Sequence, residues 1–165
     1  MLSICLMAVS LVLPVEKDFS SSYAKHFMNS RHQERVLNCM LLAKIAQEQG
    51  QNASLILAIA SVESGFLSNQ KSPVGALGLM GLMPSNIKDV PKDKRTKKVL
   101  VLRSMKILNN FKVYGKGDIC KTLAMYNAGM KGSCKGKGGG YAKTVLDRWY
   151  KICFTWGREE ECSDC

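Results

Sequence analysis

Acidic residues are scarce in this sequence. The 165 residues include 13 Asp and Glu against 24 Lys and Arg, which gives a formal net charge of +11. A surface of this kind attracts polyanions, although any single lysine can simply be a solvated side chain on a helix face. No known nucleic-acid-binding motif accompanies the charge, and the aromatic residues are not interleaved with it. We therefore expect anionic envelope polymers as candidate partners and no specific nucleic acid.

The sequence also lacks an apolar run long enough to cross a membrane. Its N-terminal run, residues 1–13, has about a dozen residues where a spanning helix needs roughly 20. This length is typical of a signal peptide, but no Lys or Arg precedes the run and no clear small-residue cleavage site follows it. The alternatives are a buried or interfacial amphipathic start of the fold, or a segment that inserts in a membrane only transiently. We expect residues 1–17 to be a signal peptide or apolar leader, and the protein to be exported to the periplasm or cell envelope.

Metal ligands are few as well. The two histidines, His26 and His32, lie near the N-terminus, and we interpret them as solvated. Cys162 and Cys165 form a CxxC, but no second CxxC and no nearby His complete a zinc set, so a disulfide or a frayed tail is favoured. We expect no metal site and no cofactor. If cleavage removes Cys5, six cysteines remain, which suits an oxidising compartment and leaves 15 pairings open.

Internal repeats are absent and strand signals are weak, whereas helical periodicity dominates. The prediction is a mainly α single domain of about six helices over residues 33–155, after a polar leader at 18–32 and before a Cys-containing tail at 156–165. The expected helices are Val36–Gln49, Leu55–Val62 after a cap at Asn52 or Ser54, part of Leu77–Ile87, Thr96–Phe111, Ile119–Ala128 and Tyr141–Phe154.

One carboxylate stands alone in the most apolar of these helices. The stretch SLILAIASVESGFLSNQ, residues 54–70, contains a single charged residue, Glu63. At the C-terminal end of a buried helix, the helix dipole and the apolar surroundings both favour the protonated carboxyl. A general acid needs that form. Alternatively, Glu63 points to solvent where the helix ends at Gly65.

Two later motifs bear on this choice. SPVGALGLMGLMP, residues 72–84, has closely spaced glycines that let backbone approach another group, with a proline near each end. LAMYNAG, residues 123–129, delivers Tyr126 and Asn127 to a helix end, where an aromatic ring and an amide could hold a sugar. A core tyrosine with a capping asparagine is the alternative.

Together, ESGFLSNQKSPVGALGLMGLMP, LAMYNAG and YAKTV resemble the catalytic domain of the soluble lytic transglycosylases, in the goose-type lysozyme-like superfamily, over roughly residues 35–152. The resemblance implies a lysozyme-like fold with a substrate groove. It also implies that Glu63 is the catalytic acid, and that the substrate-binding residues are Ser64, Gly78, Leu79, Met80, Tyr126, Asn127 and Tyr141. Gly81 departs from the family pattern, which usually has Gln there, and this puts one sugar contact in doubt.

The same resemblance implies cleavage of peptidoglycan between N-acetylmuramic acid and N-acetylglucosamine to give 1,6-anhydromuramyl products, with one glutamate acting first as acid and then as base. Two alternatives stay open. One is a goose-type lysozyme that hydrolyses the same bond, and the other is a catalytically weak peptidoglycan-binding protein. The setting could be a secretion or conjugation apparatus, or a phage particle.

Overall fold

The structure is a computed structural model that describes residues 1–12, 30–69 and 72–156. Within these residues the chain forms six α-helices joined by loops, which confirms the mainly α prediction. They are α1 (Leu2–Ser10), α3 (Ser30–Glu48), α4 (Ala53–Glu63), α5 (Lys97–Tyr114), α6 (Ile119–Ala128) and α7 (Gly139–Trp156). Short 3-10 helices cover Pro84–Ile87, Lys92–Lys94 and Gly129–Lys131.

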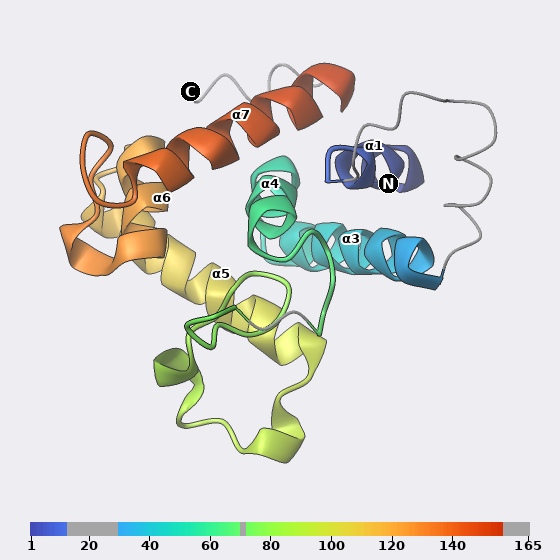
Figure 1. Ribbon diagram of the computed structural model, residues 1–165, viewed down its shortest axis with the longest axis horizontal. Helices are drawn as coiled ribbons and strands as arrows, with labels where there is room; N and C mark the ends of the chain where they lie inside the picture. Colours follow the sequence, from blue (N-terminus) through green and yellow to red (C-terminus); the bar gives the residue numbers. More distant parts are fainter. Residues whose placement is uncertain (13–29, 70–71, 157–165) are drawn as a thin grey trace.

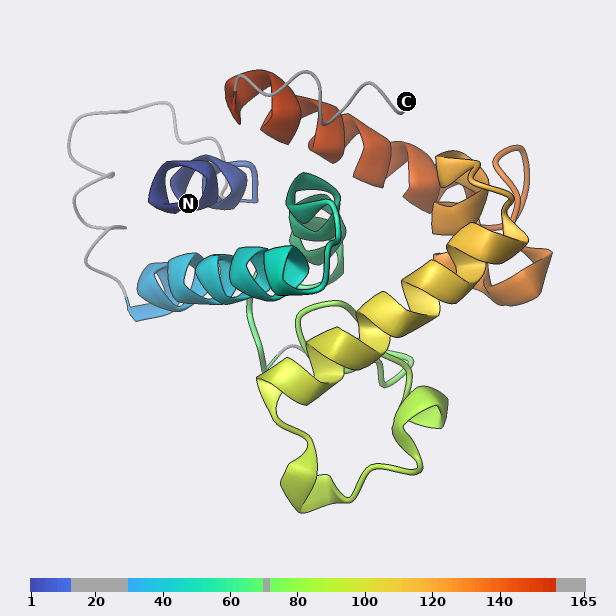
Figure 2. The ribbon, with the colours of Figure 1, turned by 180° about the vertical axis from the view of Figure 1, so that it is seen from behind.

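Helix α4 lies at the centre of the molecule and packs against α3 on one side and α7 on the other (Figures 1 and 2). The Asn52 side chain caps its first turn by accepting the Leu55 N–H at 3.0 Å, which settles the choice between the two expected caps. The next residues are apolar on all sides, and those from Ile56 to Ala60 are at most 1% exposed. A helix that is apolar all round must be buried, so α4 forms the axis of the core.

Helix α1 belongs to this core in the structure. It packs against α3, α4 and α7, and Cys5 forms a disulfide with Cys39 of α3. Arg148 of α7 also donates a hydrogen bond to the Leu11 carbonyl. This is the buried position that the alternative interpretation described, while cleavage of residues 1–17 stays a prediction. None of the helices among the described residues combines the length and hydropathy that a membrane crossing requires.

The structure also differs from the expectations at several points. Helix α3 begins at Ser30, inside the expected polar leader, and His32 is only 8% exposed, so the interpretation of His32 as solvated is wrong. The helical part of Leu77–Ile87 is reduced to one 3-10 turn at Pro84–Ile87, because proline ends the preceding pattern. Most of the leader, His26 and the Cys162–Cys165 motif lie outside the described residues.

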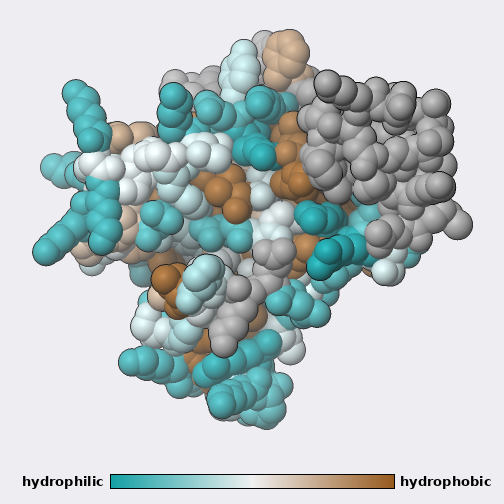
Figure 3. Space-filling view, viewed as in Figure 1, coloured by the Kyte–Doolittle hydropathy of each residue, from teal (hydrophilic) through white to brown (hydrophobic). Residues whose placement is uncertain are grey.

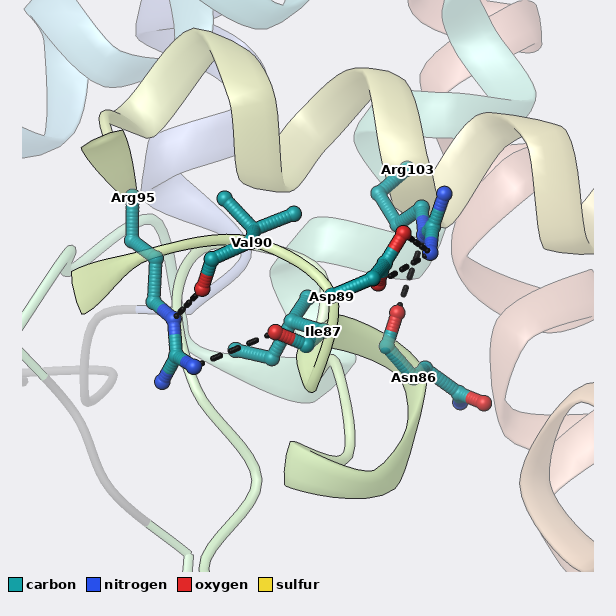
Figure 4. A network of polar contacts seen from close by, with 6 residues as sticks. All are labelled: Asn86, Ile87, Asp89, Val90, Arg95 and Arg103. Atoms are coloured by element: carbon teal, nitrogen blue, oxygen red, sulfur yellow. Dashed lines mark hydrogen bonds and ion pairs between the residues drawn. The ribbon is translucent and has the colours of Figure 1, made fainter.

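Part of the expected cationic surface serves the fold instead. In Figure 4, Arg103 binds both carboxylate oxygens of Asp89 at 2.5 Å and the Asn86 carbonyl at 2.9 Å. Arg95 donates to the Val90 carbonyl at 2.9 Å and the Ile87 carbonyl at 3.1 Å. The two arginines therefore add side-chain hydrogen bonds to backbone carbonyls of the irregular 84–95 segment.

Hydrophilic side chains still gather over two regions of the surface. In Figure 3 they cover the lower end of the molecule, where Figure 1 places the loop before α5, and the left edge, where it places the loop before α7. The lysines at 92, 94, 131, 135 and 137 in these two loops are exposed. Other exposed lysines lie on the helices, at 44, 97, 98, 106, 112, 143 and 151, so the cationic surface is spread over loops and helices.

A second disulfide, Cys120–Cys134, closes a segment of the chain that includes Tyr126 and Asn127. Its two cysteines are 14 residues apart in sequence, at the start of α6 and in the loop before α7. Cys153 of α7 is disulfide-bonded as well. A cross-link over this span limits the conformations of the unfolded chain and so favours the folded loop.

We predict that Cys120→Ser/Cys134→Ser lowers the free energy of unfolding by about 3 kcal/mol, the value for a loop of this length. Chemical denaturation under oxidising conditions measures the change, and Ser133→Ala, at an exposed position in the same loop, is the control. An unchanged midpoint and slope for the double variant would contradict a stabilising role for this cross-link.

Candidate active site

The site is built around the last residue of α4. Glu63 ends the helix and is half-buried, and burial raises the pKa of its carboxyl above the ordinary value. A smaller, opposite effect comes from the Tyr141 hydroxyl, which lies at the carboxyl and lowers the pKa. Desolvation is the dominant cause, so the protonated carboxyl persists to higher pH than in an exposed glutamate. Glu63 therefore has the electrostatic environment that suits a general acid.

Several other carboxylates of the described residues have partners of their own. Glu34 accepts hydrogen bonds from the Ser68 hydroxyl at 2.6 Å and the Ser68 N–H at 3.2 Å, and the pKa of Glu34 is lowered. Asp89 is paired with Arg103, and Asp118 caps α6 by accepting the Lys121 N–H at 2.9 Å. The contacts of Glu34 and Asp89 favour their ionised forms, whereas the surroundings of Glu63 favour the acid form.

A four-residue turn, Gly78–Gly81, lies directly against Glu63. An isolated antiparallel bridge closes the turn, with Leu77 and Leu82 exchanging N–H···O bonds of 2.9 and 2.8 Å. Both glycines have positive φ, +72° and +63°. An ideal Cβ built on Gly81 would lie 2.1 Å from Oε2 of Glu63, so the carboxyl is packed on the turn backbone itself.

Two hydroxyl groups fix the carbonyls of this turn. Ser64, which follows Glu63, donates to the Leu79 carbonyl at 2.9 Å. Tyr126 of α6 donates to the Met80 carbonyl at 2.7 Å. These two hydrogen bonds connect the turn to the end of α4 and to α6, two elements that are far apart in the sequence. Ser64 is only 4% exposed. Its hydroxyl bonds to protein backbone and so links the end of α4 to the turn.

The predicted site residues differ in how deeply they are buried. Leu79 and Met80 are each 1% exposed and place their side chains in the core, so only their backbone borders Glu63. Tyr126 and Tyr141 are half-buried close to Glu63, and the Tyr141 hydroxyl itself is buried. Asn127 is exposed at the end of α6. Gly78 is half-buried and packs near Leu100, where an added Cβ would come within 3.1 Å of its side chain.

The sequence motifs did not reveal that α3 holds the segment after Glu63. Asn38 donates to the Phe66 carbonyl at 2.8 Å, and Arg35 donates to the Gly65 carbonyl. Lys97 of α5 in turn donates to the Asn38 carboxamide oxygen at 3.0 Å. These partners are separated by about 30 residues or more, so no local pattern could have indicated them.

The segment that these bonds hold has unusual backbone geometry. Phe66 has a φ of +65°, although it is not glycine, and its side chain is fully buried. Its N–H binds the Ser64 hydroxyl at 3.1 Å. A left-handed non-glycine residue costs about 1–3 kcal/mol and persists only where its surroundings enforce it. Here burial and hydrogen bonds on both sides of the peptide enforce the sharp end of α4.

We predict that Tyr126→Phe lowers the free energy of unfolding by about 1–3 kcal/mol, because the Met80 carbonyl loses its hydrogen bond in a partly buried place. Tyr114→Phe is the matched control, since that tyrosine is 58% exposed. Urea denaturation of the two variants measures the difference. Equal stabilities would show that the Tyr126 hydroxyl does not hold the turn.

We also predict that Glu63→Gln stabilises the fold at neutral pH. The pKa of Glu63 is raised above 4.5 in the folded state, so ionisation costs more there than in the unfolded chain. This penalty is complete above the folded pKa and absent below the unfolded pKa, so the gain in the variant should vanish as the pH falls toward 4.5. Thermal unfolding over a pH series measures it, with Glu48→Gln at an exposed glutamate as the control. A gain that does not vary with pH would contradict the prediction.

Comparison with known proteins places these residues in a family. The model of the family described as "Transglycosylase SLT domain" matches residues 40–144, well over half of the chain and a range that includes Glu63, Gly81, Tyr126 and Tyr141. Among solved structures, the chain is similar to an inactive mutant of the lytic transglycosylase Slt from Pseudomonas aeruginosa, with 24% identity and a TM-score of 0.48. That match covers 79% of this chain and 23% of the other, so the present chain spans about a quarter of that protein. On the family match, this chain belongs to the transglycosylase SLT domain family.

Proposed function

We propose that this protein is a peptidoglycan lytic transglycosylase that cleaves the β-1,4 bond between N-acetylmuramic acid and N-acetylglucosamine without water. The observation that carries the proposal is the state of Glu63, a half-buried carboxyl whose pKa is raised by desolvation, at the end of a core helix in a chain of this family. The residues around it support a role as the proton donor. Peptidoglycan as the substrate follows from the family.

A single carboxylate constrains the reaction. Glycosidases that use a nucleophile or activate water generally need two carboxylates, about 5–5.5 Å or about 6.5–9.5 Å apart. Within the described residues, burial and Tyr141 are the causes of the shifted Glu63 pKa, and no second carboxylate is among them. Glu34, Asp89 and Asp118 have hydrogen-bond partners of their own. A mechanism in which the substrate supplies the missing groups therefore suits this site best.

In the proposed reaction, protonated Glu63 donates its proton to the glycosidic oxygen as the bond to the muramyl C1 breaks. The carbonyl oxygen of the substrate's own N-acetyl group forms a bond to C1 and holds the positive charge. Glu63, now ionised, accepts the proton of the muramyl C6 hydroxyl, whose oxygen displaces the N-acetyl oxygen at C1. The products are a free hydroxyl on one strand and a 1,6-anhydro ring on the other, and Glu63 is protonated again. A pKa raised toward the working pH allows one carboxyl to serve both steps.

The other site residues act in this scheme through position and contact. Ser64 and Tyr126 hold the Gly78–Gly81 turn against the acid, and Tyr141 orients the carboxyl through its buried hydroxyl. The exposed carboxamide of Asn127 offers both donor and acceptor groups to a sugar. We assign the sugar contacts along the turn to backbone rather than to the buried Leu79 and Met80 side chains.

The wider setting is also part of the proposal. We assign residues 33–155 to the catalytic domain, with export to the periplasm or cell envelope, or carriage in a virion. The disulfides suit an oxidising compartment. Exposed lysines in the loops before α5 and α7 would favour contact with anionic envelope polymers. A secretion, conjugation or phage-entry complex would be the context for local opening of the cell wall.

We predict that Glu63→Gln abolishes release of soluble fragments from purified peptidoglycan, because the amide cannot donate the proton. Glu48→Gln, which also removes one negative charge at an exposed glutamate, should retain the wild-type rate. Clearing of a cell-wall suspension measures the rate, and circular dichroism checks that both variants fold. Clearing by Glu63→Gln at the wild-type rate would remove Glu63 from the mechanism.

One observation favours an alternative function for the same site. Gly81 lacks the amide that the family usually carries there, which is compatible with a protein that binds peptidoglycan and cleaves it weakly. Such a protein would retain peptidoglycan in a sedimentation assay and give no clearing at any pH. A hydrolase of the goose-lysozyme type would instead clear the wall and release fragments heavier by one water than the anhydro products.

A further inference from the structure

The backbone of Gly81 lies so close to the Glu63 carboxyl that a side chain at position 81 would clash with it. An ideal Cβ at this position would lie 2.1 Å from Oε2, 2.6 Å from Cδ and 3.3 Å from Cγ of Glu63. Contacts below 3.0 Å are essentially never adopted by real Cβ atoms, so any other residue at this position requires something to move. The volume that a side chain would take at position 81 is occupied here by the carboxyl.

The turn itself has little freedom to retreat. Its ends are joined by the paired Leu77–Leu82 hydrogen bonds, and its two central carbonyls are held by Ser64 and Tyr126. The Leu79 and Met80 side chains anchor it in the core, each at 1% exposure. The Glu63 carboxyl, in contrast, is the far end of a flexible side chain. An added methyl group would therefore displace the carboxyl rather than the backbone.

We propose that Gly81 is a positioning residue for Glu63, and that its missing side chain creates the space in which the acid lies against the turn. The inference rests on the proposed function only for its effect on the reaction, since the contact itself is a property of the fold.

The consequence concerns the protonation of Glu63. A carboxyl pushed off the turn gains access to water, which stabilises its ionised form. The acid would then lose its proton at lower pH, and the alkaline side of the activity profile would move down with it. For each unit of that shift, the rate on the alkaline side falls about tenfold.

The test compares Gly81→Ala with Gly50→Ala. Gly50 has a φ of +61°, almost the same as the +63° of Gly81, and a Cβ there would meet nothing within 4 Å. Both variants therefore introduce the same backbone strain, and only the first meets the carboxyl. We expect the pKa of Glu63, followed by carbon-13 NMR and assigned by the loss of its signal in Glu63→Gln, to fall in Gly81→Ala and stay unchanged in Gly50→Ala. An unchanged pKa in folded Gly81→Ala would overturn the proposal.

A second measurement applies if the Gly81→Ala variant does not fold. In a Glu63→Ala background the carboxyl is gone, so Gly81→Ala should lower the melting temperature by the same amount as Gly50→Ala does. A much larger loss in that background would overturn the proposal, because an obstacle other than Glu63 would be responsible. Neither the pKa of Glu63 nor the melting temperature requires the protein to cleave peptidoglycan. An inactive wild-type protein with the expected pKa shift would therefore refute the proposed function and leave the role of Gly81 standing.

Discussion

The contact between the C-terminal end of α4 and the Gly78–Gly81 turn is the constraint on which the rest of the site depends. The Ser64 hydroxyl joins the two through the Leu79 carbonyl, and the Glu63 carboxyl rests on Gly81. Both the end of α4 and the turn are held by hydrogen bonds from other helices. Helix α3 holds the segment after Glu63 through Asn38, and α6 holds the turn through Tyr126. The acid, at the end of α4, is thus placed by three other parts of the chain, namely α3, the Gly78–Gly81 turn and α6.

Desolvation dominates the pKa of Glu63 because, among the described residues, no lysine or arginine is a cause of its shift. A lysine or arginine near Glu63 would stabilise its ionised form and lower its pKa. In the structure, Arg95 and Arg103 bind the irregular loop before α5, and Lys97 binds Asn38. Other lysines are exposed in the loops before α5 and α7. The protein therefore keeps a strongly positive exterior while its candidate acid lies in an apolar setting.

Most of the fold was predictable from the sequence because helices are encoded locally. Periodicity placed the helices, and the cap at Asn52 was one of two that the sequence allowed. The burial of His32 was not predicted, and the buried position of α1 was only the alternative to a signal peptide, since each depends on contacts with distant helices. Glu63 stood out in the sequence as a charge isolated among apolar residues, and the fold supplies the burial that raises its pKa. Gly81 was visible as a departure from the family pattern, but its reason lies in a through-space contact with Glu63.

The central claim is that one carboxylate serves as acid and then as base, so that the substrate's own hydroxyl replaces water. The most direct measurement is digestion of purified peptidoglycan in water enriched in heavy oxygen, followed by mass spectrometry of the released fragments. The account predicts anhydro fragments that carry no heavy oxygen at the muramyl C1. Fragments that are heavier by one water and contain the heavy isotope at that carbon would contradict it.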